Sequence, residues 1–254
     1  MATGMISTAG RLGRPAVLAL VLALAVALAS APGADAGKRA PLIRHMVVLP
    51  SGKAIQKRVR APRTRVRVRG RRSRCVVGRG TPLAALARSR SGRLRVRDFG
   101  SCSRRRARDG GALFVSGIGS VFNRGQDGWV YKVGRRLGTA GAADPAGPFG
   151  RGLLRGGSRV VWFYCRITGA TCQRTLAVRG RSLGGGQVRV AVVSYDDEAR
   201  KRPEQGAAVT LGGARAVTGA DGLVLFRNVP AGRFRLRAER DGLVRSFTER
   251  VAVR

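Results

Sequence analysis

Residues 63 to 70 read RTRVRVRG, with arginine at every second position and Val66 and Val68 between the arginines. Strict alternation of this kind is the period of a β-strand that buries one face. The pattern returns in RLRVR at 93–97 and in RFRLR at 233–237. Because the last copy lies in a part of the chain with little net charge, the alternation first of all predicts strands with valine or leucine inward and arginine outward.

The segment that follows the first alternating stretch predicts a helix. In GTPLAALARS, Thr81 is a suitable N-cap, Pro82 suits the first helical position, and Leu83 and Leu86 fall on one face. Strands precede and follow this helix, which is expected to end near Gly92. The order predicts an α+β domain over residues 63–178, with one main helix laid on a mixed sheet.

The chain on either side of this domain contains a lead-in, a linker and a second domain. Residues 37–62 contain three prolines and no sustained period, which predicts an extended or disordered lead-in with a short strand at 45–49. The stretch RGRSLGGGQ at 179–187 is typical of a linker. From 188 to 254 every segment alternates and is broken by GG, GADG, PAG or DG, so about seven short strands predict a small all-β sandwich.

The N-terminus predicts export. Arg11 and Arg14 precede an apolar run at 16–29 that is short for a membrane span, so residues 1–36 are expected to be a signal peptide. Cleavage after Ala36 is favoured over cleavage after Ala29, and an uncleaved membrane anchor is the alternative. We therefore expect a secreted or extracellular protein, associated with the cell surface or free, whose mature chain has no transmembrane anchor.

Four cysteines fit an oxidising compartment, where disulfides persist. Their spacing is neither C-x-x-C nor that of a zinc knuckle, so no metal site is expected. Of the three possible connectivities, we expect Cys75 to pair with Cys102 and Cys165 to pair with Cys172.

Charge is concentrated in one part of the chain. Residues 38–190 hold 36 basic residues and four acids, a net charge of +32, whereas residues 191–254 have a net charge of only +4. Such an excess predicts a surface that faces a polyanion, with a solvated basic exterior and the coding bias of a GC-rich genome as alternatives. The candidates for that surface are Arg63, Arg65, Arg67, Arg69, Arg93, Arg95 and Arg97.

Aromatic side chains give a second set of candidates. In a strand, Trp129 and Tyr131 share a face, as do Trp162 and Tyr164. If the two strands pair, these rings line one side of a sheet. They either form the core or bind a ligand, and the sequence leaves both alternatives open.

Several stretches of both domains match known families. In the first domain they are GTPL at 80–83, GIG at 117–119, GWVYKV at 128–133 and GGSRVVW at 156–162. With these stretches the first domain resembles the transcobalamin-like C-terminal domain family, which implies a β-grasp-like fold of the soluble-ligand-binding type and a flat hydrophobic, corrinoid-like ligand.

In the second domain the matching stretches are AAVTLGG at 207–213 and TGADGLVLFRNVPAGRF at 218–234. With them, residues 188–254 resemble the carboxypeptidase-regulatory-like, transthyretin-like β-sandwich, which implies a spacer or adhesive module.

Residues for catalysis are scarce. His45 is the only histidine, which leaves little material for a Ser-His-Asp triad or a histidine metal site. We expect no enzyme, no cofactor and no sequence-specific nucleic-acid binding, since no recognition motif accompanies the charge. The expected function is a binding or interaction role in the bacterial cell envelope, with wall polymer, polysaccharide or lipid headgroups as anionic partners. A small-molecule binding protein is the alternative.

Overall fold

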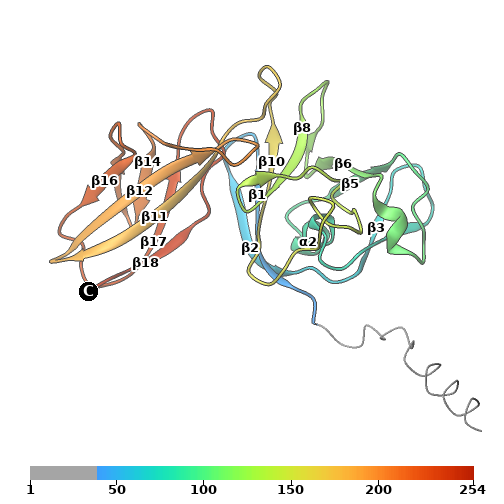
Figure 1. Ribbon diagram of the computed structural model, residues 1–254, viewed down its shortest axis with the longest axis horizontal. Coiled ribbons are helices and arrows are strands. Elements are labelled where there is room, and N and C mark those ends of the chain that lie inside the picture. The colour runs from blue at the N-terminus through green and yellow to red at the C-terminus, as the bar shows by residue number, and fades with distance from the viewer. Residues whose placement is uncertain (1–38) are drawn as a thin grey trace, which may run out of the picture. The chain divides into compact units, whose positions relative to one another are not determined.

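The structure is a computed structural model that describes residues 39–254, drawn in colour in Figure 1. The expected signal peptide, residues 1–36, lies outside the described residues. Strands hold 47% of the described residues and helices 6%, and the strands form several separate sheets. The predicted α+β class, with a main helix on a mixed sheet, is therefore wrong. The architecture is mostly β.

The one α-helix among the described residues, α2 (Pro82–Ser89), explains the error. Its start is as predicted, because the Thr81 side chain accepts a hydrogen bond from the backbone N–H of Ala84. The helix ends earlier than predicted, since Arg90 has a φ of 50° in the left-handed region. Eight residues bury Leu83 in the core but cannot cover a sheet as a layer.

A five-stranded sheet forms the centre of residues 40–165, which we call the first region (Figure 1). Two of its strands come from residues 37–62, so of the two predicted alternatives the lead-in is extended and not disordered. The short strand predicted at 45–49 corresponds to the first of them, and the second was not predicted. They became strands because β1 pairs in parallel with β10, more than a hundred residues later in the chain. In sheet order, the strands are β2 (Ala54–Arg60), β1 (Leu42–Val48), β10 (Arg159–Cys165), β8 (Gly128–Val133) and β9 (Arg136–Leu137).

Two smaller antiparallel sheets complete the first region. The strand predicted for the RTRVRVRG stretch is confirmed, and it forms a hairpin with the next strand in which Val66 lies opposite Cys75. The second small sheet carries RLRVR on its first strand, and a short 3-10 helix, η1 (Ala107–Gly110), precedes its middle strand. The strands are β3 (Thr64–Arg67) and β4 (Arg74–Val77), then β5 (Leu94–Asp98), β6 (Leu113–Ile118) and β7 (Val121–Phe122).

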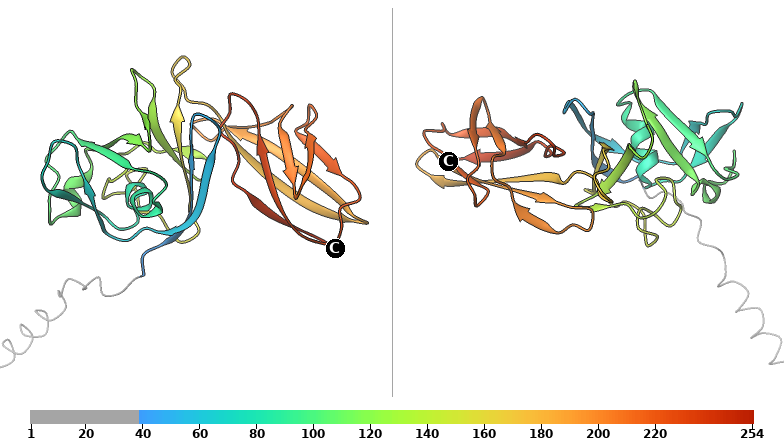
Figure 2. Two further views of the ribbon diagram at one scale, coloured as in Figure 1. Left: turned by 180° about the vertical axis from the view of Figure 1, so that it is seen from behind. Right: turned by 90° about the horizontal axis from the view of Figure 1, so that it is seen from above.

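Residues 175–254, the second region, have the predicted all-β sandwich-like architecture, and Figure 2 shows its two sheets as separate layers. Alternate valines and leucines of both sheets fill one core between them. One sheet contains β11 (Thr175–Gly184), β12 (Gln187–Tyr195), β13 (Lys201–Pro203) and β16 (Leu223–Phe226). The other contains β15 (Ala214–Val217), β14 (Ala208–Leu211), β17 (Gly232–Glu239) and β18 (Glu249–Val253).

The predicted linker at 179–187 is not a linker. These residues form the long hairpin of β11 and β12, and its turn uses Gly184, Gly185 and Gly186 with positive φ. Glycines that suggested a flexible connection thus serve a tight turn inside the sandwich. The two regions are instead connected through residues 166–174.

The predicted disulfide pairing is confirmed, with Cys75 bonded to Cys102 and Cys165 bonded to Cys172. Two disulfides are compatible with an extracellular protein. Among residues 39–254, no helix has the length and hydrophobicity that a membrane crossing requires.

Candidate functional site: an arginine groove and an aromatic pocket

The two arginine-rich stretches of the first region lie side by side. The backbone N–H of Arg69 donates to the carbonyl of Val96 at 2.9 Å, which joins the end of RTRVRVRG to β5. Val66, Val68 and Val96 point into the core and are at most 4% exposed. Since side chains alternate along a strand, the arginines of both stretches are left on the outside.

Six of the seven candidate arginines line three hollows that share residues. The first hollow, about 410 Å³, is lined by Arg65 and Arg67, and the second, about 630 Å³, contains Arg67, Arg69 and Arg93. These two hollows share Arg67 and Leu94. We call the hollows lined by Arg65, Arg67, Arg69, Arg93 and Arg95 the arginine groove. Sequence reasoning missed its further residues Arg71, Arg72 and Arg90.

Arg63 lies outside the groove, and its guanidinium group donates to the carbonyl of Arg105. None of the seven candidate arginines forms an ion pair with any residue in 39–254. The groove therefore carries charge that the described part of the chain does not neutralise.

The acids of the first region explain this, because backbone or neighbouring groups already bind them. Asp98 accepts hydrogen bonds from the N–H groups of Gly100 and Cys102 and pairs with Arg71 at 2.9 Å. Asp144 accepts from the N–H of Ala146. Both acids hold a turn in place. Asp98 also pairs with one groove residue, Arg71, but no acid side chain lines the groove itself.

The groove ends in a larger hollow of about 710 Å³, which we call the aromatic pocket. Arg69 and Arg95 belong to both, and Arg97 joins them on the pocket wall. The rings of Phe114 and Phe122, 43% and 40% exposed, lie on the outer face of the β5–β6–β7 sheet. Alternation in ALFVSGIGSVF could have identified Phe114, because it falls on the opposite face from its buried neighbours Leu113 and Val115.

The aromatics predicted from the sequence occupy the core instead. Trp129, Tyr131 and Trp162 are 3%, 6% and 1% exposed, and Tyr164 is half-buried. The condition stated for the sequence is met, since β8 and β10 pair and bring the rings together, Trp129 with Tyr164 and Tyr131 with Trp162. The hydroxyl of Tyr131 donates to the carbonyl of Ala140 at 2.6 Å, and burial raises the pKa of this phenol. Of the two alternatives left open by the sequence, core packing or ligand binding, this arrangement corresponds to core packing. Among the four aromatic residues, only Trp129 lines the pocket.

A disulfide-closed loop forms the far wall of the pocket. The Cys165–Cys172 bond closes it, and Ile167 from this loop is 40% exposed at the pocket. The backbone N–H of Ile167 donates to the carboxylate of Asp127 at 2.9 Å, which ties the loop to the turn before β8. The wall is thus held at both ends by covalent and hydrogen bonds.

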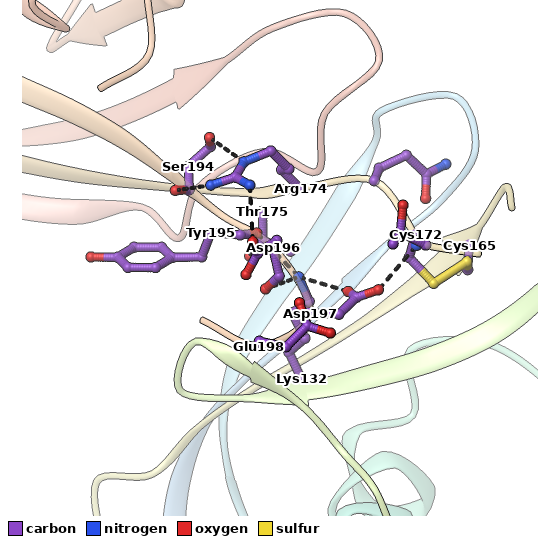
Figure 3. A network of polar contacts seen from close by, with 12 residues as sticks. Lys132, Cys165, Cys172, Arg174, Thr175, Ser194, Tyr195, Asp196, Asp197 and Glu198 are labelled. Atoms are coloured by element: carbon purple, nitrogen blue, oxygen red, sulfur yellow. Dashed lines mark hydrogen bonds and ion pairs between the residues drawn. A yellow bond between two sulfur atoms is a disulfide. The ribbon is translucent and has the colours of Figure 1, made fainter. Parts of the chain in front are cut away.

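Behind this wall, a buried lysine connects the two regions (Figure 3). Lys132 is 0% exposed, and its Nζ lies 3.2 Å from Asp197 Oδ1 and 2.9 Å from the carbonyl oxygen of Asp196. Burial lowers the pKa of this ammonium, and the Asp197 carboxylate opposes that effect. Asp197 Oδ2 also accepts from the N–H of Cys172, so the network fixes the pocket wall against the sandwich.

No arrangement of catalytic or metal-binding groups lies in the groove or pocket. One cluster elsewhere, Cys75, Asp98 and Cys102, has its ligand atoms within 4.8 Å of one another. Its two sulfurs are joined in a disulfide, and Asp98 is bound by N–H groups and Arg71, which leaves no thiolate to bind a metal. His45 is 0% exposed in the core and away from these sites.

Comparison with known proteins gave no match: no protein-family model, no curated protein and no solved structure is similar to this chain. The two family resemblances noted in the sequence therefore stay predictions. The function has to be argued from the groove and the pocket.

Proposed function

We propose that this chain is an exported, non-enzymatic binding protein of a bacterial cell envelope, whose first region binds linear anionic material through the arginine groove. The observation that carries the proposal is the set of unpaired arginines along three adjoining hollows. Wall polymer, acidic polysaccharide and the headgroups of anionic lipids all present the required charge.

The second region has both paired and unpaired arginines. There, Arg200 lies 2.9 Å from Asp196, and Arg215 lies 3.1 Å from Glu239, whereas Arg233 and Arg237 form no ion pair among residues 39–254. What distinguishes the groove is that several unpaired arginines line hollows that share residues. No acid side chain lines the groove, which is the arrangement expected of a surface whose counter-charge comes from a partner.

Arginine is well suited to such a partner. Its planar guanidinium group matches carboxylate and phosphate through two parallel hydrogen bonds and stays charged at any physiological pH. Several such groups in a row raise the local concentration of an anionic ligand before contact. No single arginine dominates this field, so binding should depend on the set.

A flat hydrophobic ligand is the second candidate. The aromatic pocket, at about 710 Å³, is within the size range of small-molecule sites. However, Trp129, Tyr131 and Trp162 are almost wholly buried, and three arginines stand on the pocket wall. An apolar ligand would have to desolvate those charges, which favours an anionic one.

Binding of polyphosphate, a linear polyanion without sugar or lipid, tests the proposal. A groove variant replaces three arginines: Arg65→Gln, Arg67→Gln and Arg69→Gln. A matched control removes the same charge from exposed positions of β17: Arg233→Gln, Arg235→Gln and Arg237→Gln.

The groove variant should bind polyphosphate about tenfold more weakly at low salt, since each exposed charge contributes up to about 1 kcal/mol. The control should stay within about twofold of the unmodified chain. Equal losses in both variants would mean that net charge alone acts, and would refute the groove.

A further inference from the structure

The aromatic pocket differs in chemistry from the groove that leads to it. The groove offers almost only guanidinium groups, whereas the pocket also contains the carboxylates of Asp127 and Asp197 and the polar side chains of Ser116, Gln126 and Thr171. Both carboxylates already accept a hydrogen bond from a backbone N–H, and Asp197 is also paired with Lys132. The remaining lone pairs of their oxygens can accept hydrogen bonds from hydroxyls. The unit that enters the pocket is therefore expected to carry hydroxyl groups besides its charge.

Two rings give the pocket an apolar floor. The ring of Phe122 crosses Gly117, where an added Cβ would lie 3.0 Å from the ring, so only glycine lets it lie this close to the sheet. The guanidinium group of Arg95 lies 4.6 Å from the centre of the same ring. Phe122 thus holds Arg95 in place through a cation–π contact, and Phe114 extends the apolar surface beside them.

Together these features place a charge site, hydroxyl acceptors and ring faces in one hollow. The negative face of an aromatic ring attracts the positive edge formed by C–H groups. A sugar ring with a carboxylate or sulfate meets all three requirements at once. Its apolar C–H face packs on phenylalanine, its anion meets arginine, and its hydroxyls donate to the carboxylates.

We propose that the aromatic pocket binds one sugar unit of an acidic polysaccharide whose chain continues along the arginine groove. The inference rests on the proposed function and narrows its partner to one class. Polyphosphate has no ring for the pocket. A nucleic-acid strand has rings, but its bases offer few hydroxyls to the hydrogen-bond acceptors of the pocket.

Three probes separate these classes in binding to the full chain: polygalacturonate, polyphosphate of matched charge and a single-stranded oligodeoxynucleotide. The pocket variant is Phe114→Ala, which removes an exposed ring and leaves the contact of Phe122 with Arg95 intact. Leu183→Ala is the matched control, because Leu183 is 41% exposed, close to the 43% of Phe114, and lines none of the three hollows.

The pocket variant should bind polygalacturonate about tenfold more weakly, at up to about 1.5 kcal/mol for each aromatic contact, and polyphosphate within about twofold of the unmodified chain. The control should change neither. Equal weakening for polygalacturonate and polyphosphate would overturn the sugar assignment, as would tighter, ring-dependent binding of the oligodeoxynucleotide. If the unmodified chain binds none of the three probes, the proposed function itself is rejected.

Discussion

His45 makes the stability of this protein depend on pH in a predictable way. Its side chain is 0% exposed, and neither ring nitrogen has a hydrogen-bond partner among the described residues. Burial, with a smaller contribution from the charge of Lys57, lowers the pKa of His45 from 6.5 to about 3. The folded state therefore keeps the ring neutral at pH values where the unfolded chain takes up a proton.

The sign and size of the effect follow from this difference. Because the folded pKa is depressed, the stabilisation is complete above pH 6.5 and is lost as the pH falls toward 3. Between pH 7 and pH 5 the free energy of unfolding should fall by about 2 kcal/mol. His45 is the only histidine, so no other side chain with an ordinary pKa titrates in this range.

Urea unfolding at pH 7 and pH 5 measures the effect, with His45→Met as the comparison. Methionine fills similar space, takes up no proton and removes no hydrogen bond. The unmodified chain should lose about 2 kcal/mol, and the variant should lose little. Equal stability of the unmodified chain at both pH values, or the same loss in the variant, would refute the reasoning.

Two further predictions concern the buried Lys132 and the two disulfides. Lys132→Met should lower the free energy of unfolding by about 3 kcal/mol, because it leaves the Asp197 carboxylate without its cation, and adding Asp197→Asn should recover part of the loss in urea unfolding. Replacing Cys165 and Cys172 by serine should cost about 2.5 kcal/mol. Replacing Cys75 and Cys102 by serine should lower the free energy of unfolding by more, about 3.6 kcal/mol, because this disulfide closes a longer loop, with a sequence separation of 27 against 7. Thermal unfolding of the two serine pairs should show that order, and the reverse order would contradict the loop-length argument.

Local signals in the sequence predicted local features. The cap of α2 at Thr81 depends on neighbours three residues away, and the hairpin of β3 and β4 follows from alternation and a basic turn. The sandwich-like architecture likewise followed from short strands and glycine turns. The cap and the hairpin are decided by neighbouring residues, whereas the sandwich followed from a pattern repeated along the whole second region.

Long-range pairing was not predictable in the same way. The sequence predicted a short strand at 45–49, but it gave no sign that this strand, β1, is central in a sheet or that β2 follows it, because the parallel partner β10 is more than a hundred residues away. The predicted linker at 179–187 shows the opposite error, since its glycines occupy a turn between two paired strands. In both cases the conformation depends on pairing with another strand, which local sequence does not reveal.

The candidate site was half predictable for the same reason. Alternation identified the arginines, and six of the seven lie in the groove or the pocket. The aromatic candidates were not predicted correctly. Trp129, Tyr131, Trp162 and Tyr164 lie on β8 and β10, and alternation cannot show that such apolar strands are buried on both faces. Phe114 and Phe122 lie on a sheet with one open face, so their exposure depends on which face the core covers.

The salt dependence of polyphosphate binding tests the central claim most directly. Each arginine that contacts the polyanion releases counterions, so the slope of the logarithm of affinity against the logarithm of salt concentration counts the contacts. Replacing Arg65, Arg67 and Arg69 by glutamine should reduce that slope by about 2 to 3. Replacing Arg233, Arg235 and Arg237 should leave it unchanged. A slope that is the same in both variants, or that is near zero in the unmodified chain, would contradict binding through the groove.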